Sequence, residues 1–290
     1  MSEIEKYMAP SDLAEAVKAL ASGGVTILAG GTDLTPQIEA GRRTHAATLM
    51  NIRHIDALAH ITQENGEIKI GSLVTVSEIR DDKLLLAAAP ILCAAANHFA
   101  SEQIRNAATL GGNICNASPA GDMIIPLLVL GTSVEISRWQ AGKTTSRRED
   151  LADFFTGPGK SILQDHELVT AVIFKKPAAN FVGQFRKSGP RPALEISTVS
   201  VAIGGDVTAG KFENVRVAFG AVGPTPLRSL KAEAALEGQI LSQDVIQAAI
   251  AAAQEDAAPI DDIRASAWYR NHLIAVFTEE LLNNVTQNRA

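Results

Sequence analysis

Two glycine pairs in this sequence have the spacing and the neighbours expected of backbone that binds an anion. Gly30-Gly31 lies in ILAGGTDL, residues 27–34, directly after a run typical of a buried strand. Gly111-Gly112 lies in TLGGNICNASPAGD, residues 109–122. Consecutive backbone N–H groups in such bends can bind phosphate, and short polar side chains can bind hydroxyl groups. A pyrophosphate joined to a ribityl chain needs both kinds of group.

The same residues also fit purely structural explanations. A glycine pair can be a tight turn that needs positive φ, and Asn113, Asn116 and Ser118 are common in turns. Asp122 either accepts hydrogen bonds from ligand hydroxyls or caps the helix expected after it. Neither pair is a dinucleotide fingerprint, because no third glycine follows at the required spacing. Composition alone leaves these alternatives open.

Other motifs that carry chemistry are missing or incomplete. The segment GPGKS, residues 157–161, ends like a P-loop, but Phe154 stands where glycine is required and Pro158 lacks an N–H donor. A surface loop is the better interpretation. The six histidines show no metal-binding spacing, and no nucleophile elbow of the G-x-S-x-G type occurs. We therefore predict no metal site and no catalytic side chain.

Composition and charge limit the class of protein. With 290 residues, 46% of them hydrophobic, the chain is long enough for two domains. A formal charge of -6 argues against a nucleic-acid partner. The acidic N-terminus lacks an apolar signal core, and the run IIPLLVLG is far shorter than the about 20 residues that span a bilayer. We predict a cytoplasmic protein without a membrane span.

Hydrophobic periodicity predicts mixed helices and strands in the first part of the chain. Ser11 and Ser77 are expected to cap helices, and Pro90 is expected to break one. Asn65-Gly66 predicts a hairpin. The predicted helices are 12–21, 83–100 and 122–131, and the predicted strands are 25–29, 47–52, 57–63, 68–72, 133–137 and 167–177.

The pattern changes after KKPAAN, residues 175–180, which is the best candidate for a domain boundary. Beyond it, strands are gathered before helices, as in an α+β domain with an antiparallel sheet. We therefore predict two domains, residues 1–176 and 177–290. The second is expected to have strands at 181–189, 196–207 and 213–223, followed by helices at 230–238, 242–256 and 268–285.

An ordered series of segments resembles the FAD-binding subunit of the molybdenum hydroxylases, a family that includes xanthine dehydrogenases and aerobic carbon monoxide dehydrogenases. One Gly-Gly motif is a weak signal, but the series covers nearly the whole chain. The segments are YMAPSDLAEAVKAL, ILAGGTDL, ATLMNIRHI, IKIGSLVTVSEI, ATLGGNICNASPAGDMIIPLLVLG, ELVTAVIF, FRKSGPRPALEISTVSVAI and SAWYRNHLIAVFTEEL.

The resemblance implies an α+β fold with a two-lobed FAD-binding domain of the PCMH type. A smaller C-terminal domain with a three-stranded antiparallel sheet and helices would follow. Lys187 would lie near the flavin and favour negative charge on it, although a solvated lysine on an edge strand is an equal alternative. The cofactor-binding residues that the resemblance implies are Ile27, Leu28, Ala29, Gly30, Gly31, Thr32, Asp33, Leu34, Phe99, Thr109, Leu110, Gly111, Gly112, Asn113, Asp122, Leu168 and Lys187.

The resemblance also implies partners. A large subunit would carry molybdopterin, a small subunit would carry two [2Fe-2S] clusters, and the FAD of this chain would pass electrons to an acceptor. Two such clusters need eight thiolates at the usual four for each, and this chain has only Cys93 and Cys115. The clusters must therefore lie on another chain, and a dimer of heterotrimers is expected. The same cysteine count argues against a branch of the family with a [4Fe-4S] insertion in this subunit.

Two other functions remain open at this stage. The chain could be a self-sufficient FAD-dependent oxidase or dehydrogenase, which would need a base over the flavin and a substrate pocket. It could also be a flavin-free scaffold or assembly module. The substrate and the electron acceptor, whether NAD, quinone or oxygen, cannot be read from the sequence.

Overall fold

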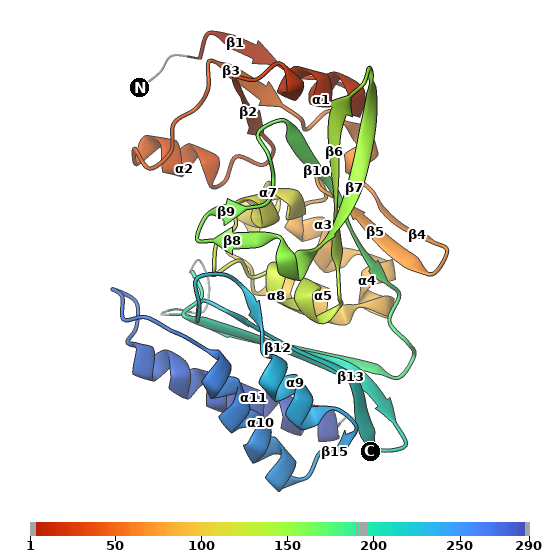
Figure 1. Ribbon diagram of the computed structural model, residues 1–290, viewed down its shortest axis with the longest axis vertical. Coiled ribbons are helices and arrows are strands. Elements are labelled where there is room, and N and C mark those ends of the chain that lie inside the picture. Colours follow the sequence, from red (N-terminus) through yellow and green to blue (C-terminus); the bar gives the residue numbers. More distant parts are fainter. Residues whose placement is uncertain (1–3, 190, 192–195, 288–290) are drawn as a thin grey trace.

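The computed structural model describes residues 4–189, 191 and 196–287. Its three larger sheets follow one another along the long axis of the molecule, from the N-terminal lobe to the C-terminal domain (Figure 1). The segment 185–203, used above for the family resemblance, includes residues 190 and 192–195, which lie outside the described residues. The same holds for the ends 1–3 and 288–290 of the two predicted domains.

The N-terminal lobe is a parallel sheet in the order β1-β3-β2. Its helix α1 begins one residue later than predicted, because the side chain of Asp12, and not Ser11, accepts from the Glu15 amide at 2.8 Å. The prediction of a Ser11 cap was wrong. The elements are β1 (Lys6–Met8), α1 (Leu13–Ala21), β2 (Val25–Leu28), α2 (Leu34–Glu39), β3 (Thr48–Asn51) and η1 (Asp56–Leu58).

The central sheet is antiparallel in the order β4-β5-β10-β6-β7. The predicted hairpin is confirmed: Asn65 and Gly66 both have positive φ, 51° and 78°, between β4 and β5. The strands are β4 (Ile61–Glu64), β5 (Glu67–Gly71), β6 (Ser133–Gln140), β7 (Lys143–Asp150) and β10 (Glu167–Lys175). The segment predicted as a surface loop forms the small hairpin of β8 (Phe155–Gly157) and β9 (Lys160–Ser161), after η2 (Leu151–Asp153).

Six short helices pack beside the central sheet. Pro90 separates α4 from α5, as predicted. Ser77 is not a cap; Thr75 caps α3, because Thr75 and Glu78 form a capping box. The stretch after Thr109, which we expected to be a loop, begins with helix α7. The helices are α3 (Val76–Asp81), α4 (Lys83–Ala88), α5 (Pro90–Asn97), α6 (Glu102–Arg105), α7 (Leu110–Cys115) and α8 (Ile124–Val129).

The C-terminal domain has three long antiparallel strands, as predicted, and two-residue strands are added at β13. Helices α10 and α11 cover one face of this sheet (Figure 1). The strands are β11 (Phe181–Ser188), β12 (Val199–Thr208), β13 (Lys211–Gly220), β14 (Leu227–Arg228) and β15 (Gln239–Ile240). The helices are α9 (Leu230–Leu236), α10 (Gln243–Asp256) and α11 (Ala267–Gln287).

Alternation along β12 gives the C-terminal sheet two different faces. Val201 and Ile203 join the core shared with the C-terminal helices, whereas Ala202 joins the core that contains α5 and α8. An added Cβ at Gly204 would lie 2.6 Å from a methyl of Val129 at the end of α8. Small residues on this face therefore let the sheet lie close against α8, the helix that directly follows Asp122.

Candidate functional site

The first glycine segment, residues 29–33, connects β2 to α2 and leaves its backbone donors unused. In the part of the chain that the structure describes, the amides of residues 29–33 have no hydrogen-bond acceptor, and Asp33 makes no capping bond to α2. Gly31 has a φ of 72°, a left-handed conformation that turns neighbouring amides toward one side. Five consecutive backbone donors are therefore available to an anion.

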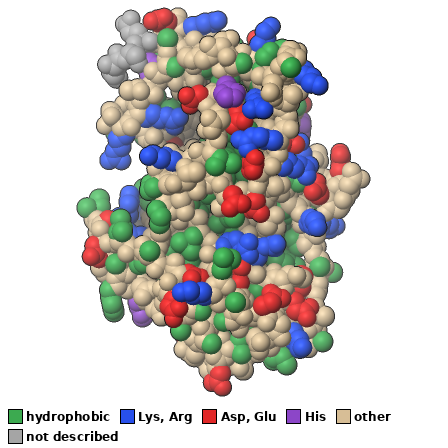
Figure 2. Space-filling model, in the orientation of Figure 1, with side chains coloured by type: hydrophobic (Ala, Val, Ile, Leu, Met, Phe, Trp, Pro, Cys, Tyr) green, Lys and Arg blue, Asp and Glu red, His purple; other side chains and the backbone are tan. Residues whose placement is uncertain are grey.

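The first glycine segment is in direct contact with Ala107, just before the second segment begins at Thr109. A Cβ added at Gly30 would lie 2.0 Å from the carbonyl oxygen of Ala107 and 2.8 Å from its carbonyl carbon. No side chain fits at this position, so glycine is required by the approach of two backbones. The structure thus brings together two segments that are nearly 80 residues apart in sequence. Figure 2 shows the surface hollowed between the region of α2 and that of α7, with basic side chains beside the hollow.

The second glycine segment does not have the unpaired backbone amides that we expected. Every amide of residues 110–113 donates within the protein: Gly111 N–H to the Ser72 carbonyl at 2.9 Å, for example, and Gly112 N–H to Thr109 Oγ1 at 3.1 Å. The expectation that the amides of Gly111 and Gly112 are free for phosphate was wrong. The reason is that this glycine pair forms the first turn of α7, with Thr109 as its N-cap.

Close packing explains the glycines of this helix. A Cβ at Gly111 would lie 2.6 Å from Cβ of Ser72, so Gly111 is buried against the end of β5. Gly112 is exposed, and a Cβ there would meet only Thr109 Oγ1, at 2.9 Å. Two buried oxygens nearby, Ser72 Oγ and Asn113 Oδ1, have no hydrogen-bond partner in the described structure. Buried polar atoms without partners are uncommon, and they fit a bound group with hydroxyls.

The side chain of Gln37 connects the two glycine segments by hydrogen bonds. Its Nε2 donates to Asp33 Oδ2 and, at 3.1 Å, to Asn116 Oδ1. The bond from Gln37 to Asn116 therefore links α2 to the end of α7. This use of Asn116 agrees with a structural role, one of the alternatives that the sequence left open.

Asp122 lies at the boundary between the central part and the C-terminal sheet, and it is buried. Lys187 Nζ of β11 donates to Asp122 Oδ2 at 2.7 Å, and the Ser197 hydroxyl donates to Oδ1. Burial raises the pKa of Asp122, while Lys187 and Ser197 act in the opposite direction. Asp122 does not cap α8, whose N-cap is Met123. Its carboxylate retains lone pairs for further donors.

Lys187 is not the solvated edge lysine that we considered as an alternative. Its side chain is only 7% exposed, and its charge is compensated by Asp122. Because each buried charge is paired, removing either one would leave the other uncompensated. The pair therefore holds β11 of the C-terminal sheet to the segment between α7 and α8.

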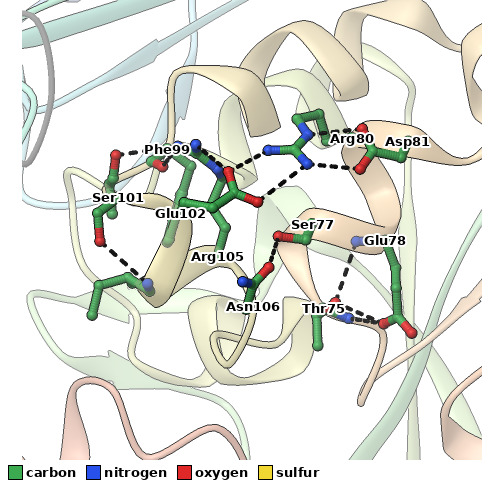
Figure 3. Close-up of polar contacts among 12 residues, drawn as sticks. Thr75, Ser77, Glu78, Arg80, Asp81, Phe99, Ser101, Glu102, Arg105 and Asn106 are labelled. Carbon is green, nitrogen blue, oxygen red and sulfur yellow. Dashed lines mark hydrogen bonds and ion pairs between the residues drawn. The ribbon is translucent and has the colours of Figure 1, made fainter.

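Phe99 and Leu168 have different surroundings. Phe99 is half-buried against the central core, in the turn between α5 and α6. Figure 3 shows this turn, with the Arg105 side chain reaching the Phe99 carbonyl. Leu168 on β10 is 4% exposed and joins the core cluster of the N-terminal lobe, which also contains Leu73. Ala29 packs against the same cluster.

Four further residues of this region were missed by sequence reasoning: Ser72, His98, Arg105 and Ser197. Partial desolvation lowers the pKa of His98, although the residue is exposed at the surface, and the charges of Lys187 and Arg186 add to this effect. Ser72 and Ser197 lie inside segments that carry the family resemblance, whereas His98 and Arg105 belong to no recognisable motif. Their relevance comes from contacts over long sequence separations, although His98 and Arg105 flank Phe99 and could have been considered for that reason.

Comparison with known proteins gives two family models in order along the chain. One, described as the FAD binding domain in molybdopterin dehydrogenase, matches residues 2–177. The other, described as the CO dehydrogenase flavoprotein C-terminal domain, matches residues 184–285. The xanthine dehydrogenase FAD-binding subunit of Escherichia coli O157:H7 is 32% identical over 98% of this chain and 96% of its own length. The carbon monoxide dehydrogenase medium chain of Hydrogenophaga pseudoflava is 27% identical over 96% of both chains.

Solved structures agree with these matches. A carbon monoxide dehydrogenase from Hydrogenophaga pseudoflava superposes with a TM-score of 0.91 and 26% identity, covering 98% of this chain and 97% of that one. Quinoline 2-oxidoreductase from Pseudomonas putida 86 gives 0.89 and 26%, with the same coverage. Among the described residues, no helix is both long enough and apolar enough to cross a membrane.

Proposed function

Because this chain belongs to the family of FAD-binding subunits of the molybdopterin dehydrogenases, we propose that it is the electron-transfer subunit of a heteromeric molybdenum hydroxylase. In this role it receives electrons from [2Fe-2S] clusters on a partner and passes them to an external acceptor. FAD supplies the redox chemistry, since a flavin exchanges electrons singly or in pairs. The observation that carries the proposal is the row of free amides at residues 29–33, in contact with Ala107, just before the second glycine segment.

We assign different tasks to the parts of the site. Residues 29–33 fit the pyrophosphate, because their five amides are unpaired and glycine at position 30 keeps the backbone accessible. The hydroxyl of Ser72 can donate to a cofactor oxygen, and Asn113 Oδ1 can accept from a cofactor hydroxyl. Exposed Gly112 leaves room for the cofactor over the first turn of α7.

Asp122 and Lys187 serve the site as a pair in this proposal. Lys187 and Ser197 hold the two carboxylate oxygens, so the direction of the remaining lone pairs of Asp122 is fixed before any ligand arrives. Asp122 then accepts hydrogen bonds from the cofactor. No residue is assigned to proton transfer.

We further propose a large molybdopterin-binding partner and a small partner with two [2Fe-2S] clusters, assembled as a dimer of heterotrimers. The two cysteines of this chain cannot ligate such clusters, and the relatives above are named as a FAD-binding subunit and a medium chain. Co-expression with neighbouring reading frames, followed by sedimentation, tests the assembly. The cytoplasmic location stays a prediction, which cell fractionation tests.

The domain boundary at residues 176 and 177 is also a proposal. Strand β10 ends at Lys175 and β11 begins at Phe181, so cleavage between them should separate the two parts without cutting a sheet. Limited proteolysis with mass analysis tests it. Cleavage first at another site would contradict it.

Hydrogen exchange tests the assignment of the pyrophosphate. In the flavin-free chain, amides of residues 29–33 should exchange quickly and those of residues 110–113 slowly, because only the second set is internally bonded. Added FAD should protect residues 29–33 and leave residues 110–113 nearly unchanged. The exposed turn at Gly41 serves as a control that FAD should not affect. Unchanged exchange at residues 29–33 in a protein that binds FAD would refute the assignment.

Reconstitution tests the electron-transfer role. In the complete complex, removal of FAD should abolish reduction of the external acceptor, while substrate still reduces the [2Fe-2S] clusters. An isolated chain that turns over a small substrate without partners would instead support a self-sufficient oxidase. A colourless chain that does not bind added FAD would support a scaffold.

A further inference from the structure

We propose that Arg105 is a positioning residue of the FAD site, which fixes the turn that carries Phe99 without touching the cofactor. This inference rests on the proposed function, because only the family resemblance puts Phe99 beside FAD. Arg105 is the last residue of α6, and its guanidinium reaches back over the turn. Its Nη1 donates to the Phe99 carbonyl at 2.6 Å and to the Ala100 carbonyl at 3.2 Å (Figure 3).

The turn needs such a clamp because its backbone is strained. Ala100 has a φ of 38°, in the left-handed region that non-glycine residues rarely adopt. The carbonyls that follow α5 also lack partners from a continuing helix. The Arg105 side chain is only 13% exposed, so its bonds to the two carbonyls face little competition from water. One buried cation thus satisfies both carbonyls of the strained turn.

A second contact orients the guanidinium. Arg105 Nη2 donates to Glu102 Oε2 at 2.8 Å, and Arg80 Nη1 of α3 donates to the same oxygen at 2.6 Å. Figure 3 shows Glu102 between the two arginines. Because a guanidinium is planar, a carboxylate at one edge fixes the direction of the donors at the other edge. Arg80 itself makes no hydrogen bond to the turn among the described residues.

The second glycine segment is held independently of this clamp. Val76 N–H donates to the Ala108 carbonyl at 3.0 Å, and the Ser77 hydroxyl donates to Asn106 Oδ1. Loss of Arg105 should therefore loosen residues 98–101 and leave residues 106–113 in place. This separation distinguishes a positioning role for Phe99 from a general loss of structure.

The test uses the full chain and the variants Arg105→Gln, Arg105→Lys, Phe99→Leu and the double variant Arg105→Gln/Phe99→Leu. Arg80→Gln is the matched control, since it removes the other arginine from Glu102 and leaves the carbonyl clamp. FAD affinity, the visible circular dichroism of bound FAD and its midpoint potential are measured. Hydrogen exchange of residues 98–101 is followed in the flavin-free chain, where no cofactor contributes.

We expect Arg105→Gln to speed exchange at residues 98–101, to weaken FAD binding by about tenfold, and to shift the dichroism and potential in the direction seen for Phe99→Leu. The double variant should bind FAD no more weakly than Phe99→Leu does, because both changes act through the Phe99 ring. Arg105→Lys should restore part of the affinity, since it keeps one donor. Arg80→Gln should match the wild type.

Several results would overturn the inference. Arg105→Gln with wild-type affinity, dichroism and potential would show that the clamp does not matter to the site. Additive losses in the double variant would show that Arg105 acts independently of Phe99, and the same loss in Arg80→Gln would assign the effect to the charge cluster. If the wild-type chain does not bind FAD, the proposed function fails, and the exchange at residues 98–101 still reports whether Arg105 holds the turn.

Discussion

The two glycine segments have similar sequences but differ in the number of backbone amides that are free to bind a ligand. Residues 29–33 form a true loop whose amides are free, whereas residues 110–113 form the first turn of a helix whose amides are all used. Glycine at 111 is required by the nearby Ser72, and glycine at 30 is required by Ala107, which lies just before the second segment. A Gly-Gly pair therefore indicates that other atoms come close to the backbone. Only the surrounding chain decides whether those atoms belong to a ligand or to the protein itself.

The largest expected effect comes from Gly30→Ala, which breaks the contact between Gly30 and Ala107. Its methyl group would lie 2.0 Å from a backbone oxygen, which cannot move as a side chain can. We expect a loss of about 3 kcal/mol in the free energy of unfolding, together with loss of bound FAD. Urea unfolding and the ratio of flavin to protein measure these. Gly157→Ala, where the nearest heavy atom is 4.0 Å from the added Cβ, is the control. Wild-type stability of Gly30→Ala would contradict the direct contact.

A pair of substitutions separates the two glycines of α7. Gly111→Ala should cost about 2 kcal/mol of stability, because its methyl would lie 2.6 Å from Ser72 Cβ and 2.8 Å from the Ser72 carbonyl oxygen. Gly112→Leu should keep the fold, since this position is exposed, but should lose flavin content. Thermal unfolding and visible absorbance distinguish the two outcomes. The comparison would be wrong if Gly112→Leu retained its flavin.

Thr109→Ala tests whether the second segment can be made to resemble the first. Removing Oγ1 frees the Gly112 amide and should cost about 1 kcal/mol, the usual value of an N-cap. Exchange at Gly112 should become faster, while Thr109→Ser should preserve both stability and protection. Equal protection in Thr109→Ala would show that another group holds this amide.

The smallest expected effect is the pH dependence of stability that His98 contributes. The pKa of His98, an exposed residue, is lowered in the folded chain by partial desolvation and by Lys187, so the folded state binds this proton less readily than the unfolded state. The contribution of His98 to stability is therefore complete above about pH 6.5, the unfolded pKa, and declines as the pH falls through that value toward the folded pKa. Urea midpoints of wild type and His98→Gln between pH 7.5 and 5 measure it. Identical dependence of the urea midpoint on pH in the two proteins would contradict the lowered pKa of His98.

Local patterns were enough to predict much of the fold. The Asn65-Gly66 hairpin, the break at Pro90 and the three long C-terminal strands depend on conformational preferences and periodicity that neighbouring residues carry. Caps were less reliable, because Ser11 and Ser77 each have a competing side chain one or two residues away. In both cases the neighbouring residue, Asp12 or Thr75, provides the acceptor.

The sequence by itself determined the family, many of the longer elements and the glycines at which close approach occurs, because these follow from residue types and local spacing. Only the tertiary structure decided which amides are free and which charges are buried. The Gly111 amide is used in a hydrogen bond to the Ser72 carbonyl. Lys187 pairs with Asp122, which is 65 positions away in the sequence. The availability of a hydrogen-bonding group depends on what distant segments bring to it, and local sequence does not contain that information.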